Sequence, residues 1–501
     1  MQPKNLNKKT QRLLRALSRQ GLNVTYNNSV YSVRLKNNCS ATVAEVLLPD
    51  DFPVEAKALK QLANLANVRH PAGGSVCKCH ATPDFHPGDS GIAIGSVVQT
   101  ENMIIPAAIG SDINCGMRLH VADLDVDAFL AKRNQFVELM KGDYFFGTRD
   151  VTMSGQAMQA LFKNGVYGWL DMMLDSPTGS ITKSDLQQLA AETDNIFLNG
   201  SMDGNHKLAP DELVPDNGLV RDGGLATIGG GNHFVEVQRV DKVVNSALAY
   251  AWGIKEGQIA FMIHSGSRHV GKYIGGMWRD KAKNAWESGV KYPESKIFPL
   301  SVNSHPELVT GYLQAVATAA NYGFINRLLL AELLRLRLRE VYGDVEAPLV
   351  YDLPHNITLP VTETENSQFK SKIQNLISKI PYWITRKGAC PADNGQAVII
   401  PGSMGDYSYL CVGKGNHKFA NSASHGAGRL RSRFDLSRGG AKETEEELGL
   451  TGVDCITLRE ERRIEEAPAA YKPIDSVIDV QVKAGIVDVV ARLSPILTFK
   501  A

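Results

Sequence analysis

Three histidines at the starts or ends of strand-like segments are the residues of this chain best suited to binding a metal ion. His233 follows three glycines and begins the alternating segment HFVEV, whereas His264 and His355 each end an apolar run, FMIH and LVYDLPH. One histidine at a strand end is usually structural. Three of them are harder to dismiss, because strand ends lie side by side in a sheet and their imidazoles can converge on one ion.

A short loop adds a carboxylate and a thiol to this set. Asp112 and Cys115 are three residues apart and follow the apolar stretch MIIPAAIG (103–110), which we expect to form a buried strand. A thiolate with imidazoles suits borderline ions such as zinc, iron or manganese, and a carboxylate shifts the preference toward harder ions. Alone, the pair is better explained by a helix-capping aspartate beside a buried cysteine. With the three histidines it predicts five ligands, enough for two ions that share the thiolate, which suits displacement at phosphorus.

His425 differs from the other histidines because small residues flank it on both sides, in the segment SASHGAGR. Backbone amides in such a segment can approach a phosphate, Arg429 adds a charge-assisted donor, and Arg386 adds positive charge earlier in the chain. An accessible imidazole there can act as a covalent nucleophile toward phosphorus. The residues alone favour the simpler alternative, a histidine in a glycine-rich turn.

Several common motifs are absent or incomplete. Cys77, Cys79 and His80 lack the Cys-x-x-Cys spacing and a second pair at a suitable distance, so we reject a zinc knuckle. The chain has neither the G-x-x-x-x-G-K-[ST] phosphate loop nor a dinucleotide-binding fingerprint, so a nucleotide must bind in another way. His86 in the segment DFHPG is a candidate for acid–base chemistry, although Pro-Gly also favours a simple turn.

Helical and strand-like segments alternate along the 501 residues, which predicts an α/β (α+β) protein with sheets flanked by helices. We expect helices over 55–68, over most of 125–200 and over 308–342, with another at 371–380. No repeat, low-complexity tract or clear linker divides the chain. The segments that carry chemistry must therefore meet in one folded unit, with the site at strand ends.

Charge and cysteine content narrow the class of protein. The formal net charge is +1, so the totals do not indicate a globally basic nucleic-acid binder, although they allow a local basic groove. Seven cysteines at irregular spacing, and an N-terminus without an apolar signal segment, predict free thiols in a reducing cytoplasm. No apolar run is long enough to span a membrane.

The N-terminal segment has its own charge pattern. Residues 1–36 contain eight Lys or Arg residues and no Asp or Glu, and Leu13, Leu14 and Leu17 recur at helical spacing. This pattern predicts a short basic amphipathic helix within the first twenty residues. A solvated helix face and an appendage that contacts phosphates both fit it.

Taken in order, these segments resemble the RtcB family of RNA-splicing ligases. The resemblance runs from about residue 55 to the C-terminus, and the ordered series is far more specific than any one motif. The series comprises PDFHPG (83–88), SDINCGMR (111–118), GGGNHFVEV (229–237), HSGSR (264–268), DLPHN (352–356), RKGA (386–389), PGSMG (401–405), HGAGR (425–429), EAPAAYK (466–472) and the terminal ARLSPILTFK.

The resemblance implies an RtcB-type catalytic domain over 51–501, preceded by a basic extension over 1–50. It implies an RNA ligase that uses GTP and two Mn²⁺ ions to join a 2′,3′-cyclic-phosphate or 3′-phosphate end to a 5′-hydroxyl end, in tRNA splicing or RNA repair. The intermediates would be a guanylylated histidine and an RNA-(3′)pp(5′)G end. An archease-type activating protein is a further partner that the resemblance implies. The alternatives that remain are an enzyme that only caps RNA 3′-phosphates with GMP and an RNA-binding factor without catalysis.

The resemblance also assigns roles to individual residues. His425 matches the histidine that becomes guanylylated, and the manganese ligands match Asp112, Cys115, His233, His264 and His355. The GTP-binding positions match Asn232, His233, Phe234, Val235, Glu236, His355, Asn356, Pro401, Gly402, Ser403, Met404, Ser408, His425, Gly426, Ala427, Gly428 and Lys500.

The chain departs from the family pattern at several places. Ser422-Ala-Ser precedes His425 where Thr-Cys is common, His269 replaces a more usual Gly, and residues 430–467 are highly charged. None of these changes removes an implied ligand or the nucleophile. Together they indicate a divergent branch, and we hypothesise that its RNA substrate is a damage-cleaved tRNA or rRNA.

Overall fold

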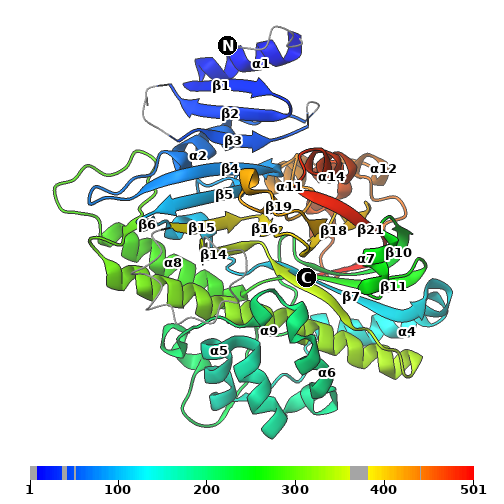
Figure 1. Cartoon of the computed structure of the whole chain (residues 1–501). Helices are drawn as coiled ribbons and strands as arrows, with labels where there is room; N and C mark the ends of the chain where they lie inside the picture. Colours follow the sequence, from blue (N-terminus) through cyan, green and yellow to red (C-terminus); the bar gives the residue numbers. More distant parts are fainter. Residues whose placement is uncertain (1–7, 37–41, 50–51, 362–381, 440–441) are drawn as a thin grey trace.

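The computed structural model describes residues 8–36, 42–49, 52–361, 382–439 and 442–501, in which two large sheets are flanked by helices (Figure 1). The predicted α/β class is therefore confirmed. The helix expected at 371–380 lies outside the described residues. Within the described part of the chain, no helix has the length and apolar character that crossing a membrane requires.

The first sheet has seven strands, and all its neighbouring strands are antiparallel except β3 and β4. Its order is β1 (Leu22–Asn27), β2 (Val30–Leu35), β3 (Ala44–Leu47), β4 (Ser75–His86), β5 (Ile94–Glu101), β15 (Tyr382–Lys387) and β14 (Asn356–Pro360).

The second sheet has eight strands, and β20 is its one strand that pairs in parallel. Its order is β13 (Leu349–Pro354), β7 (Gly116–Asp125), β11 (Gln258–Ser265), β10 (Phe234–Val243), β21 (Val487–Lys500), β18 (Ser408–Gly413) and β17 (Ala397–Ile400), with β20 (Cys455–Thr457) beside β21. Three two-stranded sheets join β6 (Met103–Ile104) to β12 (Leu300–Ser301), β8 (Met153–Ser154) to β9 (Leu219–Val220), and β16 (Ala389–Pro391) to β19 (Ser422–Ser424).

The central helix is α9 (Pro306–Tyr342), a single helix where the sequence predicted one or two. Its middle is buried, because α4 (Val126–Phe145), α5 (Gly155–Asp175) and α8 (Arg268–Asn284) pack against it. The predicted helix at 55–68 is present as α2 (Ala56–Ala66). The remaining α-helices are α1 (Lys8–Arg19), α3 (Pro106–Ile109), α6 (Leu186–Ala191), α7 (Ser246–Ala251), α11 (Arg433–Gly439), α12 (Glu445–Leu448), α13 (Glu460–Glu465) and α14 (Ile474–Lys483).

The prediction of a buried strand over 103–110 is wrong. Strand β6 covers only Met103–Ile104, and the short helix α3 follows it. Pro106 at the first helical position has the fixed φ that starts a helix, and Gly110 with φ 85° ends it. The apolar character of this stretch reflects its burial and not a strand.

Antiparallel pairing determines where the site forms. Strand β11 pairs with β10 on one side and β7 on the other, and β13 pairs with β7, all in antiparallel register. The starts of β7 and β10 therefore lie beside the ends of β11 and β13. Loops that enter or leave these four strands meet at one edge of the sheet.

A fully buried arginine of α9 ties this edge together. The Arg327 guanidinium donates to the Asp352 carboxylate at 2.7 Å and to the backbone carbonyls of Asn114 and Ser265 at 2.6 and 3.0 Å. Arg118 donates to the same carboxylate at 3.2 Å. One side chain thus holds the loop before β7, the end of β11 and strand β13 in a fixed relation.

Replacing this arginine is expected to cost far more than replacing a surface cation. Arg327→Met leaves the buried Asp352 carboxylate and two carbonyls short of donors, which we expect to lower the free energy of unfolding by about 3–5 kcal/mol. Lys291→Gln, at a side chain that is 85% exposed, should change it by less than about 0.5 kcal/mol. Denaturant unfolding measures both values. A loss below about 1 kcal/mol in Arg327→Met would contradict the role given to this network.

Candidate active site

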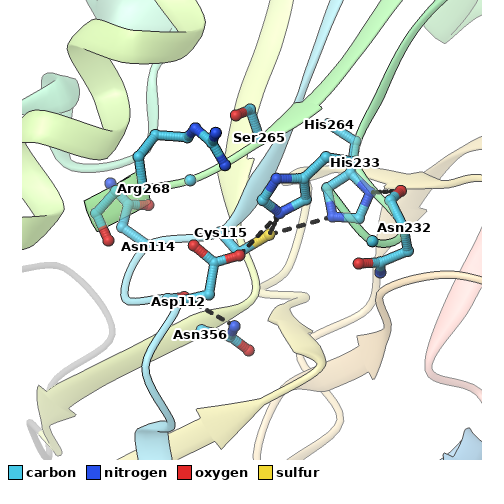
Figure 2. Close-up of polar contacts among 12 residues, drawn as sticks. Asp112, Asn114, Cys115, Asn232, His233, His264, Ser265, Arg268 and Asn356 are labelled. Carbon is cyan, nitrogen blue, oxygen red and sulfur yellow. Dashed lines mark hydrogen bonds and ion pairs between the residues drawn. The ribbon is translucent and has the colours of Figure 1, made fainter. Parts of the chain in front are cut away.

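A thiol and two imidazoles converge at the shared strand edge. Cys115 lies just before β7, His233 lies just before β10, and His264 is the second-last residue of β11. The Cys115 Sγ is 3.2 Å from the Nε2 atom of each histidine, and all three side chains are buried. Figure 2 shows them pointing toward one another. Within the described residues, this is the one group of three or more His, Cys, Asp or Glu side chains close enough to hold a metal ion together.

The hydrogen bonds of the two histidines fix their tautomers. His233 Nδ1 lies 3.1 Å from the carbonyl oxygen of Ile228, and His264 Nδ1 lies 3.0 Å from that of Asn232. A carbonyl oxygen only accepts, so each Nδ1 carries the hydrogen. Each Nε2 faces Cys115, and in a neutral ring it carries the lone pair, which is the arrangement of metal-binding histidines.

Asp112 and His355 extend the cluster on either side. The Asp112 Oδ2 is 2.8 Å from His233 Nε2, and His355 Nε2 is 3.3 Å from His264 Nε2. The carboxylate, the thiol and the three imidazoles that the sequence singled out are thus brought into one chain of contacts. Their lone pairs face one another inside the protein, and a cation would satisfy them.

Burial makes this donor set suited to a cation. Burial raises the pKa of the Cys115 thiol well above its usual range, and the nearby Asp112 carboxylate raises it further. Burial also lowers the pKa of His264 and His355 well below the usual range. These two imidazoles are therefore neutral and able to donate lone pairs. A bound divalent ion would supply the positive charge that favours the thiolate. The residues present fit a divalent metal ion, because thiolate and imidazole ligands suit borderline ions and a carboxylate suits harder ones.

His425 is paired with a buried carboxylate that the sequence analysis did not select. The Asp84 Oδ2 contacts His425 Nδ1 in a very short hydrogen bond and also accepts from the His425 backbone amide at 3.2 Å. Thr82 donates to the other carboxylate oxygen. Burial alone would raise the pKa of Asp84, but His425 and Thr82 outweigh it and hold that pKa below its ordinary value. Asp84 therefore stays ionised and orients the ring.

The free edge of His425 faces His355, at the end of the thiol–imidazole cluster, and an open cavity. Its ring centroid is 4.7 Å from that of His355, and its side chain lines the cavity wall. The close approach of the two segments needs a glycine, because a Cβ on Gly428 (φ 76°) would lie 2.2 Å from the Asp84 carbonyl oxygen. Lys472 donates to the carbonyl oxygens of Pro83 and Phe85 and so fixes the strand around Asp84.

The cavity has a volume of about 400 Å³ and holds most of the residues that the resemblance assigned to a nucleotide. Glu236 lies at its buried end, where Thr498 and Gln238 donate to its two oxygens at 2.5 and 2.6 Å. Burial raises the pKa of Glu236 to about 7. The assigned residues on the wall are Asn232, Phe234, Glu236, His355, Asn356, Pro401, Gly402, Ser403, Met404, His425, Gly426, Ala427, Gly428 and Lys500.

Three of the assigned nucleotide positions do not line the cavity wall. Val235 is buried in the hydrophobic core on the opposite face of β10, as strand alternation requires. Ser408 accepts from Gln238 at 2.9 Å and so lies behind Glu236. His233 belongs to the thiol–imidazole cluster described above.

The positive charge of the cavity comes only partly from the residues that were expected. Arg386 is buried and donates to the Ser422 hydroxyl and to the Ala420 carbonyl oxygen, so it supports β19 and not the cavity. Its neighbour Lys387 lines the wall, and burial lowers the pKa of that amine to about 8. Arg429 also lines the wall, but its guanidinium already donates to Glu466.

Two further wall residues were missed for different reasons. Arg279 on α8 and Arg433 on α11 line the cavity from helices whose sequences read as ordinary charged surfaces. No local signal identifies them. Asp84 did have a local signal, because it lies two residues before the candidate His86. His86 itself lines the cavity, and burial lowers its pKa to about 3, which removes it as an acid near neutral pH.

Comparison with known proteins shows the family of this chain. The model of the family described as tRNA-splicing ligase RtcB matches residues 61–501. The chain belongs to the RtcB family. It is similar to the tRNA-splicing ligase RtcB of Thermococcus kodakarensis, with 31% identity over 88% of this chain and 90% of the relative. It is also similar to the RNA-splicing ligase RtcB2 of Escherichia coli (30%, over 90% and 94%) and the RNA-splicing ligase RtcB of Mycobacterium tuberculosis (30%, over 87% and 99%).

Membership in the RtcB family confirms the resemblance seen in the sequence and supports RNA-ligase function, with RNA as the substrate class. Two of the departures from the family pattern lie at supporting positions, whereas the segment 430–467 contributes Arg433 and Glu466 to the cavity wall. Ser422 holds Arg386, and His269 lies 3.7 Å from the Asp222 carboxylate, at a second hollow on the far side of Asp112.

The thiol cluster gives a direct test of metal binding that does not depend on activity. Cys115→Ser should weaken Mn²⁺ binding by more than the roughly 10–100-fold typical of losing an outer-shell partner, because it removes the central ligand. Cys77→Ser is the matched control, since Cys77 is exposed and lies outside the cluster. Metal content after loading and gel filtration measures both. Equal metal content in the two variants would contradict the assignment.

Proposed function

We propose that this chain is a GTP- and Mn²⁺-dependent ligase that joins RNA ending in a 3′-phosphate or 2′,3′-cyclic phosphate to RNA beginning with a 5′-hydroxyl. The observation that carries the proposal is the pairing of His425 with the buried Asp84 carboxylate beside the metal cluster. This arrangement offers one imidazole nitrogen to a carboxylate and leaves the other directed into a nucleotide-sized cavity.

The pairing suits His425 to nucleophilic attack. Its Nδ1–H donates to Asp84, so the Nε2 lone pair is free to attack the α-phosphorus of GTP. A bond forms between Nε2 and phosphorus, and the bond to the bridging oxygen breaks and releases pyrophosphate. Asp84 stabilises the positive charge that develops on the ring, as the carboxylate of a catalytic triad does.

The remaining steps move GMP and then release it. An oxygen of the RNA 3′-phosphate attacks the GMP phosphorus, and the bond to His425 breaks. The 5′-hydroxyl then attacks the RNA phosphorus, loses its proton, and expels GMP as a new phosphodiester forms. A 2′,3′-cyclic phosphate first needs water to open the ring to a 3′-phosphate. His425 is regenerated at the second step, so the enzyme turns over.

The residues that would hold two manganese ions are Asp112, Cys115, His233, His264 and His355. Bound there, the ions would neutralise phosphate charge and stabilise entering and leaving oxygens.

The buried end of the cavity suits guanine. The Glu236 carboxylate would accept from the N1–H and N2–H donors of guanine, which adenine does not offer in that arrangement. Lys500 donates to the carbonyl oxygens of Gly231 and His233 at 3.2 Å and lines the same wall, where the guanine O6 would find a donor. Ser408 and Val235 do not line the cavity. Ser408 would act by holding Gln238, and Val235 would act through its backbone. We place the reaction in the cytoplasm, in tRNA splicing or RNA repair, with an archease-type activator as a partner.

The first step is tested by intact mass after incubation with GTP and Mn²⁺. The parent chain should gain one GMP, and His425→Ala should gain none because the nucleophile is missing. His417→Ala, at an exposed histidine eight residues earlier, should gain GMP as the parent does. An adduct in His425→Ala would overturn the assignment of the nucleophile.

Asp84→Asn extends this test to the orienting carboxylate. We expect guanylylation at least about 100-fold slower with GTP binding retained, because removing the carboxylate from such a pair costs up to about 10⁴-fold in rate. An unchanged rate would show that Asp84 has no part in the step.

Guanine recognition should depend on pH near neutrality. Since burial raises the pKa of Glu236 to about 7, the carboxylate that accepts from guanine is present above that pH and is lost below it. Guanosine affinity for the metal-free protein should therefore fall by up to roughly tenfold per pH unit below about 7 and level off above it. Guanosine has no phosphate to titrate in this range. Glu236→Gln should bind weakly at every pH, and a parent profile as flat as that of the variant would contradict the role of Glu236.

A further inference from the structure

The N-terminal module, defined as α1 with strands β1, β2 and β3, is a part of the structure that the active site does not use. It precedes residue 61, where the match to the family model begins. Strand β3 pairs with β4 over Ala44–Val46, so the module extends the same sheet that carries Asp84 (Figure 1). It is therefore fixed to the catalytic unit through backbone hydrogen bonds.

One face of α1 carries a row of arginines. Arg12, Arg15 and Arg19 are exposed and follow one another at spacings of three and four residues, which places them on one side of the helix. On the opposite side of the helix Leu14 and Leu17 are buried toward the strands of the module. The apolar face thus holds the helix in place and the arginine face is directed to solvent.

The arginine row is not neutralised by the protein around it. None of Arg12, Arg15 and Arg19 forms an ion pair with a described residue, and the first acidic residue of the chain is Glu45. By contrast, the arginines of α13 pair with nearby glutamates. In a chain with a net charge of only +1, this is a concentrated positive surface that no acidic side chain among the described residues pairs with.

We propose that the arginine row binds the phosphate backbone of the RNA substrate at a distance from its reacting end. This inference rests on RNA being the substrate, as the proposed function has it. Arginine guanidinium groups make strong charge-assisted bonds to phosphate, and such contacts give affinity without reading sequence. A row of about 10 Å, from Arg12 to Arg19, would face roughly three phosphates of one strand.

The chemistry of the row favours RNA over a membrane surface. An interfacial membrane helix directs apolar side chains outward to enter the lipid. Here Leu14 and Leu17 are directed inward, and Ala16 is the apolar residue exposed among the arginines. A row of cations on a rigid helix, without an apolar partner surface, matches a hydrated polyanion.

The position of the module sets the length of RNA that can reach it. Three strand spacings of about 4.8 Å separate β1 from β4, and Asp84 lies near the far end of β4. The row is therefore on the order of 20–30 Å from His425, which corresponds to about six to nine nucleotides along a duplex strand. A shorter RNA would occupy the active site without touching the row.

The test compares two RNAs and two triple variants. Arg12→Gln/Arg15→Gln/Arg19→Gln removes the row. Lys163→Gln/Lys183→Gln/Lys255→Gln removes three exposed cations elsewhere and is the matched control. Binding of a 24-nucleotide stem-loop and of a 4-nucleotide RNA, both ending in 3′-phosphate, is measured by fluorescence anisotropy at several salt concentrations.

The arginine variant should bind the stem-loop roughly tenfold more weakly at low salt and lower the slope of log affinity against log salt by about 2–3. The 4-nucleotide RNA should bind as it does to the parent, and the control variant should match the parent with both. An arginine variant that binds the stem-loop like the parent, or that loses both RNAs equally, would overturn the proposal. Loss of binding to phosphatidylserine vesicles with RNA binding unchanged would overturn it in favour of a membrane.

The two proposals fail in different ways. Binding needs no chemistry, so it can be measured even in a chain that does not ligate. GMP attachment to His425 in the arginine variant, at the parent rate, shows that its active site is intact, because the row lies far from Asp84 and His425. If the parent itself binds neither RNA, the proposed function fails and the inference fails with it.

Discussion

The buried ion pair between Arg327 and Asp352 is the interaction on which the rest of the site depends. A buried guanidinium is tolerable only when its donors are matched by a carboxylate and carbonyl oxygens, and Arg327 has both. Those carbonyls belong to the loop that carries Asp112 and Cys115 and to the end of the strand that carries His264. Helix α9 therefore positions the proposed metal ligands, which come from separate parts of the chain, through backbone contacts.

Antiparallel strand pairing brings the side chains of the site together. Cys115 and His233 lie where strands begin, and His264 and His355 lie where strands end. Antiparallel pairing places these strand ends beside one another. Backbone carbonyls then fix the tautomers of His233 and His264, so the lone pairs converge without further adjustment. Burial keeps the His264 and His355 imidazoles neutral and penalises a bare thiolate at Cys115. The same burial that stabilises the fold thus prepares the cluster for a cation.

The orientation of His425, the proposed nucleophile, depends on contact between distant segments. Asp84 and His425 are 341 residues apart in the chain, and their contact requires a glycine at 428, where the backbones approach closely. The N-terminal module extends the sheet of Asp84 outward, so the proposed RNA surface and the orienting carboxylate share one rigid support. Substrate length and chemistry would then be linked through the geometry of a single sheet.

The sequence by itself determined the residue types, the α/β class and the family, because ordered motifs such as SDINCGMR and GGGNHFVEV carry chemistry that local spacing reveals. It predicted the convergence of three histidines on Cys115, although one flanking strand, at 103–110, proved to be a short helix. Only the tertiary structure decided that Asp84 orients His425, that Lys387 and not Arg386 faces the cavity, and that Val235 lies in the core. These depend on which faces meet across the sheets, and pairing between distant strands leaves no local signal in either segment.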